Sequence, residues 1–245
     1  MRHVFISGVS SGIGHALAAL HLARGDEVWG VSRRVPEDLQ QHPGFHFRAL
    51  DLCAPERAYP ALQMFLGETC FDTAYLNAGT FGHAPELAVS TSVDAFREVL
   101  DLNVVAVKWV LDLLLCRDSQ PRQVVFSASV SGIRQRAGML SYSVSKAALN
   151  ALAKVYHLEN PEVFFAVFGL CNVDTLVAQT ILNADERFAE LVALRERSGQ
   201  PGYIVSPAKR AEDIVTLLGC RHALALQSGQ FYEVRQLLER MHTEV

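Results

Sequence analysis

The 245-residue sequence lacks the cysteine patterns that mark disulfide-rich proteins and zinc sites. Its five cysteines, Cys53, Cys70, Cys116, Cys171 and Cys220, are scattered, odd in number and form no C-x-x-C pair. We therefore expect neither a disulfide framework nor a metal site. We interpret these residues as buried, reduced thiols of a cytoplasmic protein.

Long apolar runs and an excess of basic charge are also missing. The longest apolar run, VFFAVFGLC (163–171), is much shorter than the roughly 20 residues of a membrane-spanning helix. The formal net charge of −4 argues against a nucleic-acid partner, which selects a basic face. The start MRHVFISG leads directly into a predicted strand, so we expect no signal peptide and no membrane partner.

What the sequence does contain is a regular alternation of strand and helix patterns. There is no internal repeat, low-complexity tract or linker, so residues 1–245 are predicted to form one domain. The alternation favours an α/β fold, a doubly wound (Rossmann) parallel sheet with helices on both faces. The clearest predicted strands are 4–8, 26–32, 45–50, 122–129, 162–169 and 228–234, and the clearest predicted helices are 57–67, 92–118, 140–156 and 206–219.

A glycine-rich turn follows the first predicted strand. Gly8, Gly12 and Gly14 lie between VFISG (4–8) and a helical apolar pattern. Glycines let the backbone approach a pyrophosphate, and the start of a helix offers free N–H groups and the positive end of its dipole. Ser10 and Ser11 can cap the helix or contact phosphate. The spacing is G-x-x-x-G-x-G, and a plain strand-to-helix turn remains an alternative.

A second pattern places a serine, a tyrosine and a lysine near one another. Tyr142 and Lys146 are four residues apart in a predicted helix and therefore share one face. An ammonium beside a phenol favours the phenolate, so we expect Lys146 to lower the pKa of Tyr142 from about 10. The hydroxyl of Ser129 can hold a carbonyl oxygen in line with the phenol. The alternative is a surface tyrosine and lysine on an amphipathic helix.

Both patterns, in this order, resemble the short-chain dehydrogenase/reductase (SDR) family over nearly the whole chain. The resemblance rests on SGVSSGIG (7–14), DL (51–52), NAG (77–79), Asn103 in LNV, SASVSG around Ser129, YSVSK (142–146) and VDT (173–175). It implies an oxidoreductase that transfers a hydride between NADP(H) and a small-molecule carbonyl or alcohol substrate. It also implies a homodimer or homotetramer, formed through the long helix and the tyrosine helix.

The resemblance assigns the cofactor-binding residues position by position. Asp51 and Leu52 would lie against the adenine, and Asn77, Ala78 and Gly79 would pass beneath its ribose. Val173 and Thr175 would bind the carboxamide of the nicotinamide. The full set that the resemblance implies is Gly8, Ser10, Ser11, Gly12, Ile13, Gly14, Arg33, Arg34, Asp51, Leu52, Asn77, Ala78, Gly79, Tyr142, Lys146, Val173 and Thr175.

The end of the second predicted strand indicates which dinucleotide is preferred. An acidic residue there binds the ribose 2′-hydroxyl of NAD(H), whereas an arginine accommodates the 2′-phosphate of NADP(H). Here Ser32 is followed by Arg33 and Arg34, with no carboxylate. Two guanidinium groups can grip a phosphate, so we predict NADP(H) rather than NAD(H). A solvated arginine pair is the alternative.

The resemblance also implies four catalytic residues. Tyr142 would be the general acid in reduction and the base in oxidation. Lys146 would hold the ribose hydroxyls of the nicotinamide half, and Ser129 would bind the substrate oxygen. Asn103 would lie at a break in the long helix and hold a water in a proton relay to Lys146. The alternatives are a solvated helix residue for Asn103 and a plain turn serine for Ser129.

The sequence departs from the family pattern after the sixth predicted strand. Leu170 and Cys171 stand where the family usually has Pro-Gly, so the wall beside the nicotinamide is expected to differ in shape. Residues 176–205 are predicted to form a helical lid over the substrate. Met139 and Leu140 are candidates for the pocket wall.

Several charged residues are interpreted as solvated. We expect His83, Arg134 and Arg136 in solvent-facing loops, although each could also face a substrate. His15, His21 and His157 are expected on helix surfaces.

Three functions remain open on this evidence. The first is an NADP(H)-dependent carbonyl reductase or alcohol dehydrogenase that uses Tyr142 as its acid and base. The second is a non-catalytic dinucleotide-binding sensor or scaffold on the same fold. The third is an isomerase or dehydratase that uses a bound dinucleotide.

Overall fold

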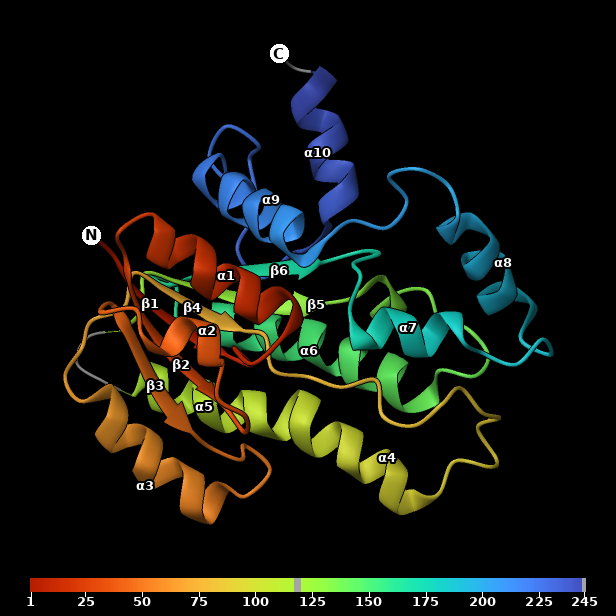
Figure 1. Cartoon of the computed structure of the whole chain (residues 1–245), viewed down its shortest axis with the longest axis horizontal. Helices are drawn as coiled ribbons and strands as arrows, with labels where there is room; N and C mark the ends of the chain where they lie inside the picture. Colours follow the sequence, from red (N-terminus) through yellow and green to blue (C-terminus); the bar gives the residue numbers. More distant parts are fainter. Residues whose placement is uncertain (117–119, 244–245) are drawn as a thin grey trace.

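The protein folds around a seven-stranded parallel sheet, which confirms the predicted α/β class (Figure 1). The structure is a computed structural model that describes residues 1–116 and 120–243. The strand order is β3-β2-β1-β4-β5-β6-β7. From β1 the chain first adds strands on one side of the sheet and then, from β4 onward, on the other side. The strands are β1 (His3–Ser7), β2 (Glu27–Ser32), β3 (Phe45–Ala49), β4 (Thr73–Leu76), β5 (Gln123–Ala128), β6 (Phe164–Gly169) and β7 (Phe231–Glu233).

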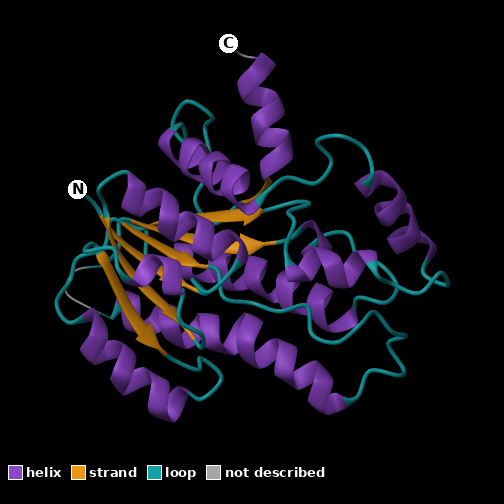
Figure 2. Ribbon diagram, in the orientation of Figure 1, coloured by secondary structure: helices purple, strands orange, loops and turns teal. Residues whose placement is uncertain are grey.

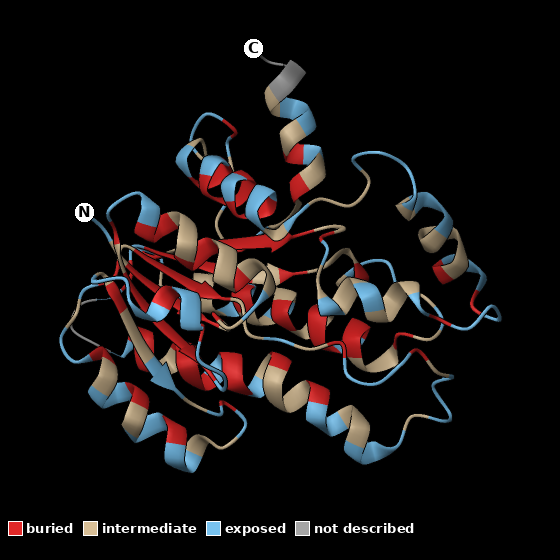
Figure 3. Ribbon diagram, in the orientation of Figure 1, coloured by how far each residue is buried: buried red, intermediate tan, exposed pale blue. Residues whose placement is uncertain are grey.

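The central strands are buried on both faces. All four residues of β4 are buried, as are five of the six residues of β6. Both strands are nearly continuous apolar runs, which is the pattern of a parallel sheet covered by helices on either side. Figure 3 shows the resulting core as a band of buried strands between partly exposed helices.

Helices cover the two faces of the sheet (Figure 2). One face packs against α3 (Pro55–Leu66), α5 (Ala106–Leu115) and α6 (Leu140–Glu159). The other face packs against α1 (Gly12–Ala23), α2 (Glu37–Gln40), α9 (Pro207–Gly219) and α10 (Val234–Thr243). This arrangement confirms the doubly wound architecture. The remaining elements are α4 (Val93–Leu100), the π turn η1 (Asp101–Val105), the 3-10 turn η2 (Val130–Gly132), α7 (Leu176–Leu182) and α8 (Ala189–Ser198).

The long helix predicted over residues 92–118 is not one regular α-helix. It begins at Val93, where the Ser92 side chain accepts a hydrogen bond from the Ala95 N–H (3.1 Å). It then passes through η1, where the Ala106 N–H bonds to the carbonyl of Asp101, and continues as α5. A π turn inserts one extra residue into the helix and re-aims the side chains around it. Residues 117–118 of the prediction lie outside the described residues.

The predicted start of α9 is confirmed, whereas the role of residues 176–205 as a lid stays a prediction. Ser206 caps α9 by accepting a hydrogen bond from the Lys209 N–H (3.1 Å), and Pro207 occupies the first turn. The predicted lid, residues 176–205, contains α7 and α8. The last strand is shorter than predicted, with only Phe231–Glu233 paired to β6.

The prediction that the cysteines are buried is wrong. Cys53, Cys70 and Cys116 are exposed, and Cys171 and Cys220 are half-buried. The three exposed cysteines lie after β3, before β4 and at the end of α5. Their positions in connecting segments, outside the packed faces of the elements, explain their exposure.

The prediction that His21 lies on a helix surface is also wrong. His21 is 2% exposed and faces the sheet from α1. Its Nδ1 lies 2.8 Å from the carboxylate of Asp26, and its Nε2 lies 3.1 Å from the hydroxyl of Tyr75. Both ring nitrogens thus have polar partners, which makes burial of the imidazole tolerable. Burial lowers the pKa of His21, and the hydrogen bond with Asp26 opposes this effect. His15 and His157 are half-buried, and His15 pairs with Asp38 (2.9 Å).

Within residues 1–116 and 120–243, no helix combines the length and the apolar character needed to cross a bilayer.

Candidate active site

The predicted site residues converge at the carboxyl ends of the central strands. The glycine-rich turn follows β1, the NAG segment (77–79) follows β4 and Ser129 follows β5. Residues 170–175 follow β6 and lead into the lid. Ligands of doubly wound sheets bind at this edge, near the point where the strand order reverses. The topology therefore brings together segments that are far apart in the sequence.

The glycine-rich turn forms a cradle of bare backbone, and side chains at its glycine positions would fill the space inside it. Gly8 has a φ of 82°, in the left-handed region that favours glycine. A Cβ on Gly14 would lie only 2.2 Å from the Gly8 carbonyl oxygen, and one on Gly12 would lie 3.3 Å from Cγ2 of Thr175. Ser11 occupies the N-cap of α1, yet its side chain makes no capping hydrogen bond. The bare backbone and the uncapped helix start fit the pyrophosphate of a dinucleotide.

The NAG segment is fastened to this turn by side-chain hydrogen bonds. The Ser7 hydroxyl oxygen accepts from the N–H groups of Asn77 (3.0 Å) and Ala78 (3.1 Å). The Asn77 amide oxygen accepts in turn from the Ser127 hydroxyl (3.0 Å). A Cβ on Gly8 would lie 2.9 Å from Cα of Ala78, so the two turns are in close backbone contact. Nothing in the sequence indicates that Ser7 bonds to the NAG segment, because Ser7 looks like an ordinary strand residue.

The arginine pair lies at the other side of the cradle, after β2. Arg33 and Arg34 are exposed, and neither pairs with a carboxylate among the described residues. Arg33 is close enough to Cys53 to oppose the rise in the pKa of that thiol, which burial causes. Asp51 is exposed and accepts a hydrogen bond from the Cys53 N–H (3.0 Å), whereas Leu52 is buried. The structure therefore gathers the predicted adenine and 2′-phosphate residues at one edge.

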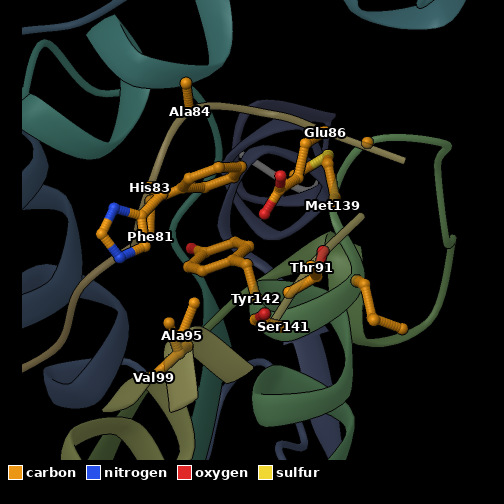
Figure 4. A pocket seen from close by; sticks show the side chains of 12 residues that line it. Phe81, His83, Ala84, Glu86, Thr91, Ala95, Val99, Met139, Ser141 and Tyr142 are labelled. Carbon is orange, nitrogen blue, oxygen red and sulfur yellow. The ribbon is translucent and has the colours of Figure 1, made fainter. Parts of the chain in front are cut away.

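Tyr142 lies near the start of α6 in an aromatic and apolar setting. It is 8% exposed, and its ring centroid lies 5.2 Å from that of Phe81. Figure 4 shows its side chain beside Phe81, with Met139 and His83 around the same small cavity. Met139 and Leu140 do line cavities next to Tyr142, as predicted. His83 is largely exposed and pairs with Glu98 (3.6 Å).

The predicted effect of Lys146 on Tyr142 is wrong for this structure. Burial raises the pKa of Tyr142, and a hydrogen bond with Ser129 only partly offsets the rise. Burial also lowers the pKa of Lys146 to about 8. The Lys146 Nζ donates to the Ser127 carbonyl (2.7 Å) and lies 5.5 Å from the centroid of the Tyr142 ring. Burial is the largest cause of both shifts, because low polarity penalises the charged form of each group.

Asn103 lies within η1 and is fully buried. Its Oδ1 accepts from the Thr80 N–H (2.8 Å), and its Nδ2 donates to the Thr80 carbonyl (2.8 Å) and the Ser145 hydroxyl (3.0 Å). The amide therefore braces the segment after NAG against α6, beside Lys146. Thr80 and Ser145 were not identified from the sequence. The predicted water relay stays a prediction.

The segment SASVSG (127–132) offers three serines that could hold the substrate oxygen, and Ser129 is the one beside the phenol. The Ser127 hydroxyl is bonded to Asn77, and Ser131 is buried with its N–H bonded to the Ser129 oxygen (3.1 Å).

Cys171, which stands where the family usually has glycine, has a backbone conformation that favours glycine. Its φ is 60°, in the left-handed region where a side chain is strained. Its thiol donates to the Gly169 carbonyl (3.3 Å) and faces the Glu233 carboxylate (3.6 Å). The departure from Pro-Gly thus changes the wall by adding a thiol rather than by unfolding the turn. Beyond it, Val173 is buried and Thr175 caps α7.

A cleft of about 1060 Å³, including its open mouth, extends from Ser129 and Tyr142 to the lid. Val173 and Thr175 line it on one side, and Val177, Ile181 and Leu194 of the lid segment form an apolar wall. Four of its lining residues were not identified from the sequence: Arg197, Tyr203, Glu233 and Arg235. Glu233 could have been identified from the sequence, because it lies at the carboxyl end of the last predicted strand and ligands bind at that edge of the sheet.

Comparison with known proteins gives one family and a common fold. The family model described as short chain dehydrogenase matches residues 2–184. A curated NADPH-dependent 3-dehydrocapnine reductase from Ornithobacterium rhinotracheale is 29% identical over 166 residues, which are 62% of this chain and 58% of that relative. The match therefore spans little more than half the length of the relative.

Solved structures share the fold over almost the whole chain. A short chain dehydrogenase family protein from Francisella tularensis has a TM-score of 0.78 and 20% identity, with 95% of this chain and 96% of that chain covered. A 4-hydroxyisoleucine dehydrogenase in complex with NADH has a TM-score of 0.76 and 23% identity, with the same coverage of 95% and 96%.

Proposed function

Because the chain belongs to the short chain dehydrogenase family, we propose that it is an NADP(H)-dependent oxidoreductase acting on a carbonyl or alcohol substrate, with Tyr142 as general acid and base. The observation that carries this proposal is that Ser129 and Tyr142 line one cleft, with the Lys146 Nζ 5.5 Å from the centroid of the Tyr142 ring and a glycine cradle that fits a dinucleotide nearby.

The two exposed arginines after β2 support NADP(H) as the preferred dinucleotide. Neither Arg33 nor Arg34 has a carboxylate partner among the described residues, so both guanidinium groups are free to hold a 2′-phosphate. The relative from O. rhinotracheale is described as NADPH-dependent, whereas the 4-hydroxyisoleucine dehydrogenase structure contains NADH. The arginine pair of this chain is the feature that supports NADP(H) over NAD(H) in this proposal.

The residues around the cleft each have a task in carbonyl reduction. The bound dinucleotide would supply the hydride. Ser129 would hold the substrate oxygen by a hydrogen bond. Tyr142 would donate its phenol proton to that oxygen as negative charge develops on it. Burial raises the pKa of Tyr142, so the phenol carries its proton at neutral pH and can donate it.

Lys146 would act beside the phenol rather than as its direct partner. Its Nζ is fixed by the Ser127 carbonyl and is close to Gly79, whose added Cβ would lie 3.7 Å away. It can therefore hold the ribose hydroxyls of the nicotinamide half. With its pKa lowered to about 8, it can also exchange a proton near neutral pH. Asn103 would hold the NAG segment and the helix that carries Lys146 in fixed relative positions, through its hydrogen bonds to Thr80 and Ser145.

The test is a screen of NADPH oxidation against ketones and aldehydes, with Tyr142→Phe as the matched variant. The proposal predicts turnover by the wild type, a loss of at least about a thousandfold in the variant, and equal NADPH affinity in both. NADPH binding with no turnover on any carbonyl would favour a sensor or scaffold. Conversion of substrate without net NADPH oxidation would favour an isomerase or dehydratase.

We also propose a homodimer or homotetramer formed through the long helix and α6. Apolar side chains are exposed on both elements, namely Val105, Val144, Val155 and Leu158. Burying such side chains against a second copy would be favourable. Light scattering should give at least twice the monomer mass, and Val155→Glu with Leu158→Glu should lower it to that of the monomer.

A further inference from the structure

The substrate cleft has a charge opposite to that of the protein as a whole. The chain carries a net charge of −4, yet four arginines line the cleft against a single carboxylate. The arginines are Arg134, Arg136, Arg197 and Arg235, and the carboxylate is Glu233. A cleft lined by one sign of charge concentrates ligands of the other sign. The lining therefore favours an anion.

The four arginines come from three separate parts of the chain. Arg134 and Arg136 lie in the segment between η2 and α6, Arg197 lies in α8, and Arg235 lies in the first turn of α10. Their convergence is therefore a result of the tertiary fold. A surface charge run within one helix would not place them around one cavity.

Three of these arginines have no acidic partner among the described residues. Arg134 lies 3.6 Å from Glu233, but no carboxylate pairs with Arg136, Arg197 or Arg235. Arg197 and Arg235 instead pack against the ring of Tyr203, with guanidinium-to-centroid distances of 5.9 Å and 5.1 Å. Stacking on an aromatic ring orients a guanidinium group and leaves edge N–H donors for a ligand. In Arg197 the Nε–H already donates to the Ala193 carbonyl (2.9 Å), so the two terminal Nη groups are its remaining donors.

Apolar side chains line the same cleft as the arginines. Val177, Ile181 and Leu194 of the lid pack with Met139 and Tyr142 in one apolar cluster. The same side chains line the cleft together with the arginines. A ligand that fills it would therefore meet the phenol, an apolar wall and the guanidinium groups.

From this arrangement we propose that the substrate is an oxo acid, in which an apolar chain joins the reacting carbonyl to a carboxylate, sulfonate or phosphate. The carbonyl part rests on the proposed function. The anionic part rests on the arginines alone. The acid group is bound by Arg136, Arg197 and Arg235, and the chain lies along Val177, Ile181 and Leu194. The three acid groups share the chemistry that guanidinium groups recognise by paired hydrogen bonds.

The first experiment compares oxo acids with their methyl esters as substrates in the presence of NADPH. The panel varies the number of carbons between the ketone and the acid group. For at least one acid, kcat/KM should exceed that of its ester by about tenfold or more, and the difference should shrink as salt is added. Equal values for every acid and ester pair would overturn the proposal.

Two variants and one control locate the effect. Arg136→Gln and Arg197→Gln should each lower kcat/KM for the acid about tenfold more than for the ester, mainly through KM. The control is Arg187→Gln, because Arg187 is also a lid arginine but pairs with Asp185 (3.8 Å) and does not line the cleft. The proposal would be overturned if Arg187→Gln lowered kcat/KM for the acid as much as the two variants do. It would also be overturned if the two variants bound NADPH more weakly and did not discriminate between acid and ester.

A second measurement does not depend on turnover. Octanoate, octanesulfonate and octyl phosphate are titrated by calorimetry into the protein with NADP⁺, with octanol as the uncharged control. At least one anion should bind about tenfold more tightly than octanol, and the double variant of Arg136 and Arg197 should lose that difference. Equal binding of octanol would refute the anionic site. If no carbonyl compound is turned over but the anions bind through the arginines, the proposed reaction fails and the anionic site stands.

Discussion

The two ends of the proposed active site, the glycine cradle and the cleft below the predicted lid, are built in different ways. At the dinucleotide end, the surface is backbone, exposed because Gly8, Gly12 and Gly14 carry no side chains. At the lid end, the surface is made of long side chains, among them Arg136, Arg197 and Arg235. The first kind of surface suits a ligand common to a whole family. The second kind can change one side chain at a time and suits a ligand specific to one member.

The two ends also differ in how firmly they belong to the core. β1 and β4, which lead into the cradle, are buried in the middle of the sheet. In the lid, α7 has no buried residue and α8 has only Leu191. Few buried contacts mean a low free energy of local opening. Changes in the cradle should therefore affect folding and cofactor binding, whereas changes in the lid should affect the substrate.

The largest effect is expected for Gly14→Ala in the cradle. The new methyl group would lie 2.2 Å from the Gly8 carbonyl oxygen, which belongs to rigid backbone. We expect the free energy of unfolding to fall by about 3 kcal/mol or more, and dinucleotide binding to be lost. Denaturant unfolding and NADPH titration measure the two effects. Gly219→Ala is the matched control, since no atom lies within 4 Å of its added Cβ, and it should leave both nearly unchanged.

A smaller effect, with a definite pH dependence, is expected for Lys146→Met. The pKa of Lys146 falls from 10.5 in the unfolded chain to about 8 in the fold, so between these values the unfolded chain binds more protons. The wild type therefore gains stability from this group as the pH rises from 8 to 10.5. The fall in pKa corresponds to about 3 kcal/mol, and the loss of the hydrogen bond to the Ser127 carbonyl costs about 1 kcal/mol. Lys146→Met should therefore be more stable than the wild type by about 2 kcal/mol below pH 8, and less stable by about 1 kcal/mol above pH 10.5.

Unfolding midpoints across that pH range test the prediction. Lys154→Met, at an exposed position on the same helix, is the control and should show no such pH-dependent difference. An advantage of Lys146→Met that is independent of pH would contradict the buried charge as its cause.

At the adenine edge, Arg33→Ala should weaken NADPH binding about tenfold and leave NADH binding unchanged. The reason is that the guanidinium group is exposed and without a carboxylate partner, and is thus available to a 2′-phosphate. Fluorescence titration with both dinucleotides measures the two affinities. Arg57→Ala, which removes an exposed arginine from α3, should change neither. An equal loss for both dinucleotides would contradict the proposed preference.

The smallest effect is expected at Cys171, where the two ends meet. Its left-handed backbone is strained by a side chain, so Cys171→Gly should raise the free energy of unfolding by about 1 kcal/mol. Cys171→Val places a β-branched side chain there and should lower it by about 1 kcal/mol. Denaturant midpoints compare the two. A more stable Cys171→Val would contradict the account of strain.

The difference between the two ends also explains what the sequence could predict. The glycine turn and the Tyr142 and Lys146 pair depend on short-range spacing, and the structure places them where that spacing indicates. The burial of His21 depends on Tyr75, 54 positions away in the chain, and could not be inferred from the pattern of α1. Arg197 and Arg235 come to the cleft through the lid and α10, so no local pattern connects them to Tyr142.

The direction of the pKa shift at Tyr142 was missed for a related reason. Lys146 is four residues from Tyr142 in the sequence, and this spacing suggested that charge attraction would be the main influence on the pKa of Tyr142. The structure adds burial by Phe81, Met139 and the lid, and burial dominates. Charge pairs can be read from spacing, but the polarity of their surroundings depends on the whole fold.

The most direct test of the central claim is transfer of deuterium from NADPH labelled at C4 of its nicotinamide ring, using each of the two C4-deuterated forms. With one of these forms, mass spectrometry should find deuterium on the carbinol carbon of the product made by the wild type and by Arg187→Gln, and none with Tyr142→Phe. Product that carries no deuterium with either form, or labelled product formed equally by Tyr142→Phe, would contradict the claim that this cleft reduces a carbonyl with Tyr142 as the acid.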